Sequence, residues 1–213
     1  MSHAFHSEHG QDKWLDEHVF HGMRDGVFVE VGALDGLNGS NTLYFEEAFG
    51  WTGVLIEANP HSALDCVKNR PKCETVFAAA LDISGEYLDL MALEGGFFGW
   101  SGIAEAMHPT HLSRIIEQTV ESQRKVMPVL TRRLDDILRE RGMTRIDYMS
   151  IDVEGAEHKA LIGLGDMVRG IHIVDIENNW EDDVASAAWL EKHRFRKICR
   201  LGVNDIWIND EWR

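Results

Sequence analysis

The sequence predicts an α/β protein: a seven-stranded Rossmann-like, mostly parallel sheet with helices on both faces and an antiparallel last strand. Three observations support this fold class. Short apolar runs typical of buried strands alternate with helix-like segments along the whole chain. The first run, 27–31, leads directly into a glycine-bearing turn. The last two runs, 195–199 and 205–208, lie close enough in sequence to form a closing hairpin.

The other elements follow the same alternation. One segment, 95–102, departs from it by mixing aromatic residues with glycines, and it is open to interpretation as a mobile lid or as an ordinary surface loop. Helix starts are indicated at Ser40-Asn41-Thr42 and at Asn59-Pro60. We expect helices at 10–21, 110–123, 134–141 and 185–193, and strands at 54–56, 75–80, 87–91, 126–130, 146–151 and 171–176.

Length and composition limit the function classes. A chain of 213 residues favours one domain, here an N-terminal helical cover segment over 1–25 followed by a core over 27–209. The net charge of −15 argues against a nucleic-acid partner, because phosphate backbones require a basic surface. Three cysteines without metal-ligand spacing favour a reducing, cytoplasmic location. No apolar run has the length of a signal peptide or a membrane span, so we expect no membrane partner.

The first strand and its turn point to a nucleoside ligand. The strand runs into Glu30-x-Gly32-x-x-x-Gly36, and the second strand ends in another acid, Glu57. Open α/β sheets hold adenosine with this arrangement, in which the second acid accepts from the ribose hydroxyls. Glu30 stands where a pyrophosphate would otherwise lie, and a carboxylate there repels phosphate but suits a cationic amino-acid ligand. The motif therefore favours S-adenosylmethionine over NAD.

Four motifs resemble the FkbM family of S-adenosylmethionine-dependent methyltransferases, in the same order along the chain. They are 28–36, 40–42, 50–57 and 152–157, and the resemblance extends from about residue 9 to residue 209. It implies a class I methyltransferase fold and O-methylation of a hydroxyl on a small molecule, usually a sugar or a glycosylated metabolite. Two alternatives remain open: an NAD-dependent oxidoreductase or epimerase on a similar sheet, and a non-catalytic S-adenosylmethionine-binding protein.

The predicted donor site combines the strand motifs with their neighbours. Glu30 is assigned to the methionine amino group or its water, Gly32 and Gly36 to close backbone approach, and Glu57 to the ribose. Asn41 is open to two interpretations, donor binding and helix capping. Gln11, with Asp12, resembles a short family motif that folds over the donor, and it is equally open to interpretation as a helix N-terminus with a solvated acid. The residues expected around the adenine and along the donor are Ala58, Asn59, Ala80, Leu81, Asp82 and Asp152.

The acceptor side is predicted from the ends of the later strands. Asp152, Glu154 and His158 follow the strand at 146–151 and are the candidate catalytic groups. Asp152 with Glu177-Asn178 also resembles the Mg²⁺ site of catechol-type O-methyltransferases, because hard oxygen ligands suit that ion. Trp100, Ser101 and His108 are candidates for the wall of the acceptor pocket. A homodimer is the commonest assembly and our first expectation.

Overall fold

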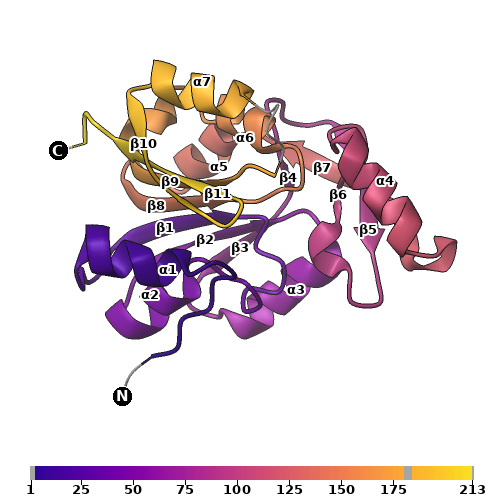
Figure 1. Cartoon of the computed structure of the whole chain (residues 1–213), viewed down its shortest axis with the longest axis horizontal. Helices are drawn as coiled ribbons and strands as arrows, with labels where there is room; N and C mark the ends of the chain where they lie inside the picture. The colour runs from indigo at the N-terminus through magenta and orange to yellow at the C-terminus, as the bar shows by residue number, and fades with distance from the viewer. Residues whose placement is uncertain (1–2, 180–183, 213) are drawn as a thin grey trace.

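The computed structural model describes residues 3–179 and 184–212, and its centre is one seven-stranded sheet (Figure 1). The strand order is β10-β11-β9-β8-β1-β2-β3. All neighbours from β9 to β3 run parallel, whereas β11 is antiparallel to both β9 and β10. The strands are β1 (Val27–Val31), β2 (Thr52–Glu57), β3 (Glu74–Phe77), β8 (Ile146–Ile151), β9 (Ile171–Glu177), β10 (Phe195–Leu201) and β11 (Asn204–Asn209).

Helices cover both faces of this sheet, as the sequence predicts (Figure 1). Strands buried on both sides have side chains in two separate cores, one under each set of helices. Three helices pack onto one face through Leu134, Leu161 and Leu190. Three more helices pack onto the opposite face through Leu15, Phe45 and Cys66. The first set is α5 (Leu134–Glu140), α6 (Glu157–Gly163) and α7 (Ala185–Lys192), and the second is α1 (Gln11–Leu15), α2 (Leu43–Phe49) and α3 (Pro60–Asn69).

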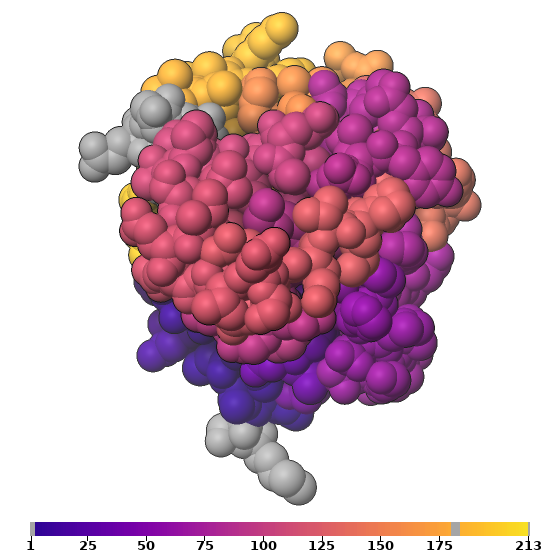
Figure 2. Space-filling view, turned by 90° about the vertical axis from the view of Figure 1, so that its right-hand side faces the viewer, coloured from indigo at the N-terminus to yellow at the C-terminus, as the bar shows by residue number. Residues whose placement is uncertain are grey.

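A second, four-stranded sheet lies beside the main one, with strand order β4-β7-β5-β6. It packs its inner face around Leu90, Ile103 and Val129, and α4 (Pro109–Gln118) adjoins it through Ile115, which packs with Leu93 of β5. In Figure 2 these segments, magenta to salmon, form a continuous layer across the face turned to the viewer. The strands are β4 (Ala79–Ala80), β5 (Tyr87–Leu93), β6 (Gly102–Ile103) and β7 (Arg124–Arg132).

Several predicted elements differ in extent from the observed ones. The strand predicted at 75–80 divides into β3 and β4, which belong to different sheets. The helix predicted at 10–21 becomes a π-helical turn after Leu15, over Asp16–Phe20. The helix predicted at 110–123 ends at Gln118, and a separate 3₁₀ turn follows. The strands at 87–91 and 126–130 are real but longer, because they pair with each other over seven positions.

Across residues 3–179 and 184–212, every helix falls short of the length or the apolar character that a bilayer crossing requires.

Candidate active site

One cavity of about 600 Å³ opens at the carboxyl ends of the parallel strands. It lies where the strand order reverses, between β1 and β8, which is where open α/β sheets bind ligands. Its walls come from the turns after β1, β2, β8 and β9, from the N-terminal segment, and from the second sheet. Among the lining residues are Glu8, His9, Gln11, Glu30, Gly32, Leu34, Asn41, Glu57, Ala58, Ala80, Leu81, Trp100, Ser101, Arg114, Asp152, Glu154 and Glu177.

The turn after β1 brings the chain against the neighbouring strand end. Gly32 has a φ of +83°, and a Cβ atom at this position would stand 1.7 Å from the carbonyl oxygen of Asp152. Leu34 also adopts a positive φ, of 50°, which is a strained conformation for that residue. Its backbone N–H donates to Oε2 of Glu57 at 2.8 Å. The turn is therefore held in one conformation against β2 and β8.

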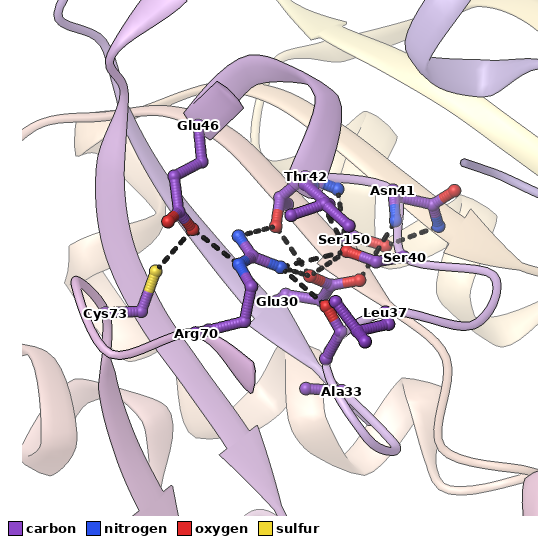
Figure 3. A network of polar contacts seen from close by, with 12 residues as sticks. Glu30, Ala33, Leu37, Ser40, Asn41, Thr42, Glu46, Arg70, Cys73 and Ser150 are labelled. Atoms are coloured by element: carbon purple, nitrogen blue, oxygen red, sulfur yellow. Dashed lines mark hydrogen bonds and ion pairs between the residues drawn. The ribbon is translucent and has the colours of Figure 1, made fainter. Parts of the chain in front are cut away.

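Beneath this turn, Glu30 is enclosed in a polar network (Figure 3). Its carboxylate accepts from the Ser40 hydroxyl at 2.9 Å and the Thr42 hydroxyl at 2.6 Å. It also accepts from the backbone N–H of Asn41 at 3.0 Å. Burial raises the pKa of Glu30, and the nearby guanidinium of Arg70 opposes this shift. Glu30 thus fixes the segment before α2 and is largely satisfied by protein groups, although it also lines the cavity.

Arg70, at the end of α3, completes this network and carries no local sequence signal. Its side chain is 1 % exposed. Nε donates to Glu46, and Nη1 donates to the Gly36 carbonyl at 3.0 Å. A Cβ on Gly36 would approach the Arg70 side chain to 2.9 Å. Gly36 therefore makes room for Arg70, whereas the sequence assigns it to donor contact.

Glu57 and Asn41 offer unused acceptor capacity beside the cavity. Glu57 accepts from the backbone N–H groups of Leu34 and of Asn59, the latter at 2.7 Å. Burial raises the pKa of Glu57 to about 7, and these N–H groups oppose the shift. Asn41 donates to the Ser150 hydroxyl at 2.9 Å, while its own Oδ1 is buried without a partner. A buried acceptor without a donor costs about 1–3 kcal/mol, which a ligand N–H group would recover.

A cluster of acids lies at the ends of β8 and β9 and at the start of α6. Oxygen atoms of Asp152, Glu157 and Glu177 lie within 4.8 Å of one another. Glu177 and Asp152 share a side-chain hydrogen bond. Burial, with repulsion between neighbouring carboxylates, raises the pKa of Asp152 to about 7 and that of Glu177 to about 11. Glu157 accepts from the backbone N–H groups of Val153 and Gly155, each at 3.0 Å.

Glu154 faces the same cavity from the turn between β8 and α6. It has a positive φ of 55°, and burial is the main cause that raises its pKa to about 9. Repulsion from Asp152 and Glu157 adds to this rise, and Arg114 opposes it. The guanidinium of Arg114 lies 3.8 Å above the Trp100 ring. Neither Arg114 nor the cavity-lining Glu8 and His9 figures in the sequence prediction, because nothing local in the sequence sets them apart.

The structure brings most of the predicted donor residues to the cavity and leaves others outside it. Asn59 caps α3 by accepting from the His61 N–H at 3.0 Å. Asp82 is exposed, and its carbonyl accepts from Arg133 at 2.8 Å. Asn178 donates to Asp205 at 3.0 Å, so Glu157 takes its place beside Asp152 and Glu177. The predicted site residues absent from the cavity wall are Gly36, Asn59, Asp82, His108, His158 and Asn178.

Comparison with known proteins agrees with this site. The methyltransferase FkbM domain matches residues 30–197. The chain therefore belongs to the FkbM methyltransferase family, as the four motifs indicate. Family membership supports S-adenosylmethionine as the methyl donor and methyl transfer as the reaction. No curated protein is similar enough in sequence to match it.

Solved structures agree on the fold. The METTL16 MTase domain superposes with a TM-score of 0.53 at 9 % identity, over 95 % of this chain and 66 % of that one. The chain thus spans just under two thirds of that domain. Aeropyrum pernix fibrillarin with natively bound S-adenosyl-L-methionine gives a TM-score of 0.50 at 10 % identity, over 95 % of this chain and 73 % of that one. Both have the class I methyltransferase fold, so the predicted fold class is confirmed.

Proposed function

We propose that this methyltransferase transfers the methyl group to a hydroxyl oxygen of a small molecule, namely a saccharide or a glycosylated metabolite. The observation that supports this proposal is the pair Asp152 and Glu154, which line the same cavity as the donor-side residues Glu57 and Asn41. O-methylation requires a base for the hydroxyl proton, and acids with raised pKa values are suited to that task.

The donor half fits S-adenosylmethionine. Glu57 would accept from the ribose hydroxyls, because both of its oxygens keep free lone pairs beside the two N–H groups they already bind. Asn41 would accept from the donor's ammonium group through its unpartnered Oδ1. Gly32 lets the turn after β1 pass close to the end of β8, because a side chain at this position would clash with the Asp152 carbonyl oxygen. When bound, the donor supplies an electrophilic methyl group to the acceptor oxygen.

On the acceptor side, the protein holds the hydroxyl and takes its proton. Glu154 is our candidate base, and Asp152 stands at the strand end between the two halves of the cavity. Both pKa values are raised by burial, and a cationic ligand beside them would lower them toward neutral pH. His158, the predicted alternative base, does not line the cavity. Trp100 offers an aromatic ring on which the apolar face of a sugar would stack.

Mg²⁺ is a separate proposal. The donor set that suits it consists of Asp152 and Glu177, which line the cavity, together with Glu157 beside them. An ion there would lower the pKa of the acceptor hydroxyl and remove the need for a protein base. If EDTA treatment left turnover unchanged, the metal-assisted mechanism would be excluded and the mechanism with a protein base would stand.

The first test is thermal unfolding with S-adenosylhomocysteine, with NAD⁺ or with neither, each with and without Mg²⁺. A ligand at one hundred times its dissociation constant adds about 2.7 kcal/mol, or roughly 5–10 °C for a chain of this size. We expect stabilisation by S-adenosylhomocysteine alone. Radiolabelled methyl transfer to a panel of free and nucleotide-linked sugars then tests the acceptor. Products methylated only on nitrogen would contradict the proposal.

A further inference from the structure

Helix α4 places a buried histidine behind the candidate base. His111 is the third residue of α4, and its side chain is 2 % exposed. Its Nε2 lies 3.3 Å from Oε2 of Glu154 and 3.1 Å from the carbonyl oxygen of Trp100. One ring nitrogen therefore faces two cavity-lining residues that come from different parts of the chain.

These distances fix the tautomer of the ring. A backbone carbonyl can only accept, so the nitrogen that lies 3.1 Å from Trp100 must bear the hydrogen. The same nitrogen lies 3.3 Å from Oε2 of Glu154, so its N–H, which donates to the Trp100 carbonyl, also stands in polar contact with that carboxyl oxygen. This contact holds Oε2 on the helix side of the carboxylate. Its other oxygen, Oε1, takes no part in this contact.

The backbone around Glu154 is fixed from the same direction. A Cβ on Gly102 would stand 3.2 Å from Cβ of Glu154, and a Cβ on Gly155 would stand 2.9 Å from the Ala106 carbonyl oxygen. Segment 102–106 thus packs directly against the turn that bears Glu154. Because that turn has little room to move, the orientation of the carboxylate depends on its side-chain torsions. Those torsions are what the His111 contact restrains.

The same helix also restrains Trp100. Arg114, one turn further along α4, stacks its guanidinium 3.8 Å above the Trp100 ring. His111 meets that ring edge-on, with ring centroids 6.2 Å apart. Helix α4 therefore contacts both walls of the acceptor half of the cavity: the aromatic segment and the acid.

We propose that His111 is a positioning residue, which orients the Glu154 carboxylate through the polar contact between its Nε2–H and Oε2, so that Oε1 faces the acceptor hydroxyl. This inference rests on the proposed function, because it assigns Glu154 to proton removal. If His111 served only to hold the Trp100 carbonyl, the effect of replacing His111 on kcat would be the same with and without the Glu154 carboxylate. The two roles therefore predict different kinetics.

The decisive variants are His111→Leu, which removes the donor, and His111→Gln, whose amide N–H reaches a similar position. With the acceptor found in the sugar screen, we expect His111→Leu to lower kcat by at least about tenfold while KM for S-adenosylmethionine stays within twofold. His111→Gln should recover most of kcat. In a Glu154→Gln background, His111→Leu should change kcat little, because the group it orients is already lost.

Two further measurements keep the inference open to refutation. Nitrogen-15 NMR of the whole protein should find His111 with hydrogen on Nε2; hydrogen on Nδ1 alone would overturn the proposal, even if no acceptor is found. Equal loss of kcat in the Leu and Gln variants, or full additivity with Glu154→Gln, would also overturn it. S-adenosylhomocysteine binding should be unchanged in every variant. A wild-type protein that fails to bind S-adenosylhomocysteine would instead count against the proposed function.

Discussion

The guanidinium of Arg70 lies 3.8 Å from the carboxylate of Glu30, and both side chains are buried beneath the donor half of the cavity. The pair links the end of α3 to β1, and through Ser40 and Thr42 it also fixes the segment that begins α2. Three elements that support the donor site therefore share one enclosed cation.

Replacing Arg70 with Met should destabilise the fold by about 3–5 kcal/mol, because it leaves Glu30 and Glu46 buried without a cation. Urea unfolding followed by circular dichroism measures the loss. Lys68→Met is the matched control: Lys68 lies on the same helix, and its ion pair with Asp65 is exposed, so we expect a change within about 0.5 kcal/mol. Equal effects of the two substitutions would show that the buried network adds nothing.

Gly32→Ala should abolish S-adenosylhomocysteine binding. The added methyl group would stand 1.7 Å from the Asp152 carbonyl oxygen, at a φ of +83° that also disfavours alanine. Calorimetric titration measures the affinity. Gly85→Ala is a suitable control, because Gly85 has a φ of +89° but nothing within 4 Å of the new methyl group. If Gly85→Ala proved as damaging, backbone strain would explain the result, and the close approach to β8 would not.

The sequence predicts the main sheet well because its strands are locally encoded. Val27–Val31 and Ile146–Ile151 are apolar runs whose strand character depends on no distant partner. The second sheet is different. Its strands β4 and β6 have only two residues each, so β6 forms only through its pairing with β5, and β4 becomes separate from β3 only through its pairing with β7. No local pattern separates such strands from loops.

The site residues divide in the same way, into those that local sequence predicts and those that depend on packing between distant segments. Glu57 and Asp152 are predictable because an acid at the end of a buried strand faces the ligand edge of the sheet. Asp82 follows the same logic but comes after β4, outside the main sheet, and is therefore exposed. Arg70 and His111 acquire their partners 24 and 43 positions away, through packing that only the folded chain reveals.

The free energy of unfolding should fall as the pH rises from about 5 to 7. Burial raises the pKa of Asp152, Glu157 and Asp175 to about 7, so the folded state holds protons that the unfolded state has released. A carboxyl whose pKa is raised by folding stabilises the protein at low pH, and this contribution is lost as the pH approaches the folded value. Chemical unfolding at a series of pH values measures the slope.

One substitution should make that slope shallower. The pKa of Glu177 is raised to about 11, so Glu177→Gln removes a proton linkage that spans the whole range. Glu140→Gln serves as the control, because the pKa of Glu140 is lowered by Arg132 and both states are ionised above pH 6. An unchanged slope in Glu177→Gln would mean that the pKa of Glu177 is not raised in solution, for instance because a bound cation offsets the repulsion between the clustered carboxylates.

Affinity for S-adenosylhomocysteine should increase with pH up to about 7 and then level off. Burial raises the pKa of Glu57 to about 7, and only the ionised carboxylate accepts fully from the ribose hydroxyls. Below that pH, a proton must leave before the ligand binds, so affinity should fall about tenfold per pH unit. Calorimetric titrations between pH 5.5 and 8.5 measure the profile.

Glu57→Gln should remove this pH dependence and weaken binding at pH 8 by roughly 10- to 100-fold, the value of a lost hydrogen bond to a charged group. Asp82→Asn makes the same carboxylate-to-amide change at an exposed position outside the cavity wall, so we expect wild-type affinity. Weakened binding in Asp82→Asn would instead support the sequence prediction that this side chain contacts the adenine. A pH-independent wild-type affinity would mean that Glu57 is ionised before the donor binds, and that the turn after β1 holds its carboxylate in that state.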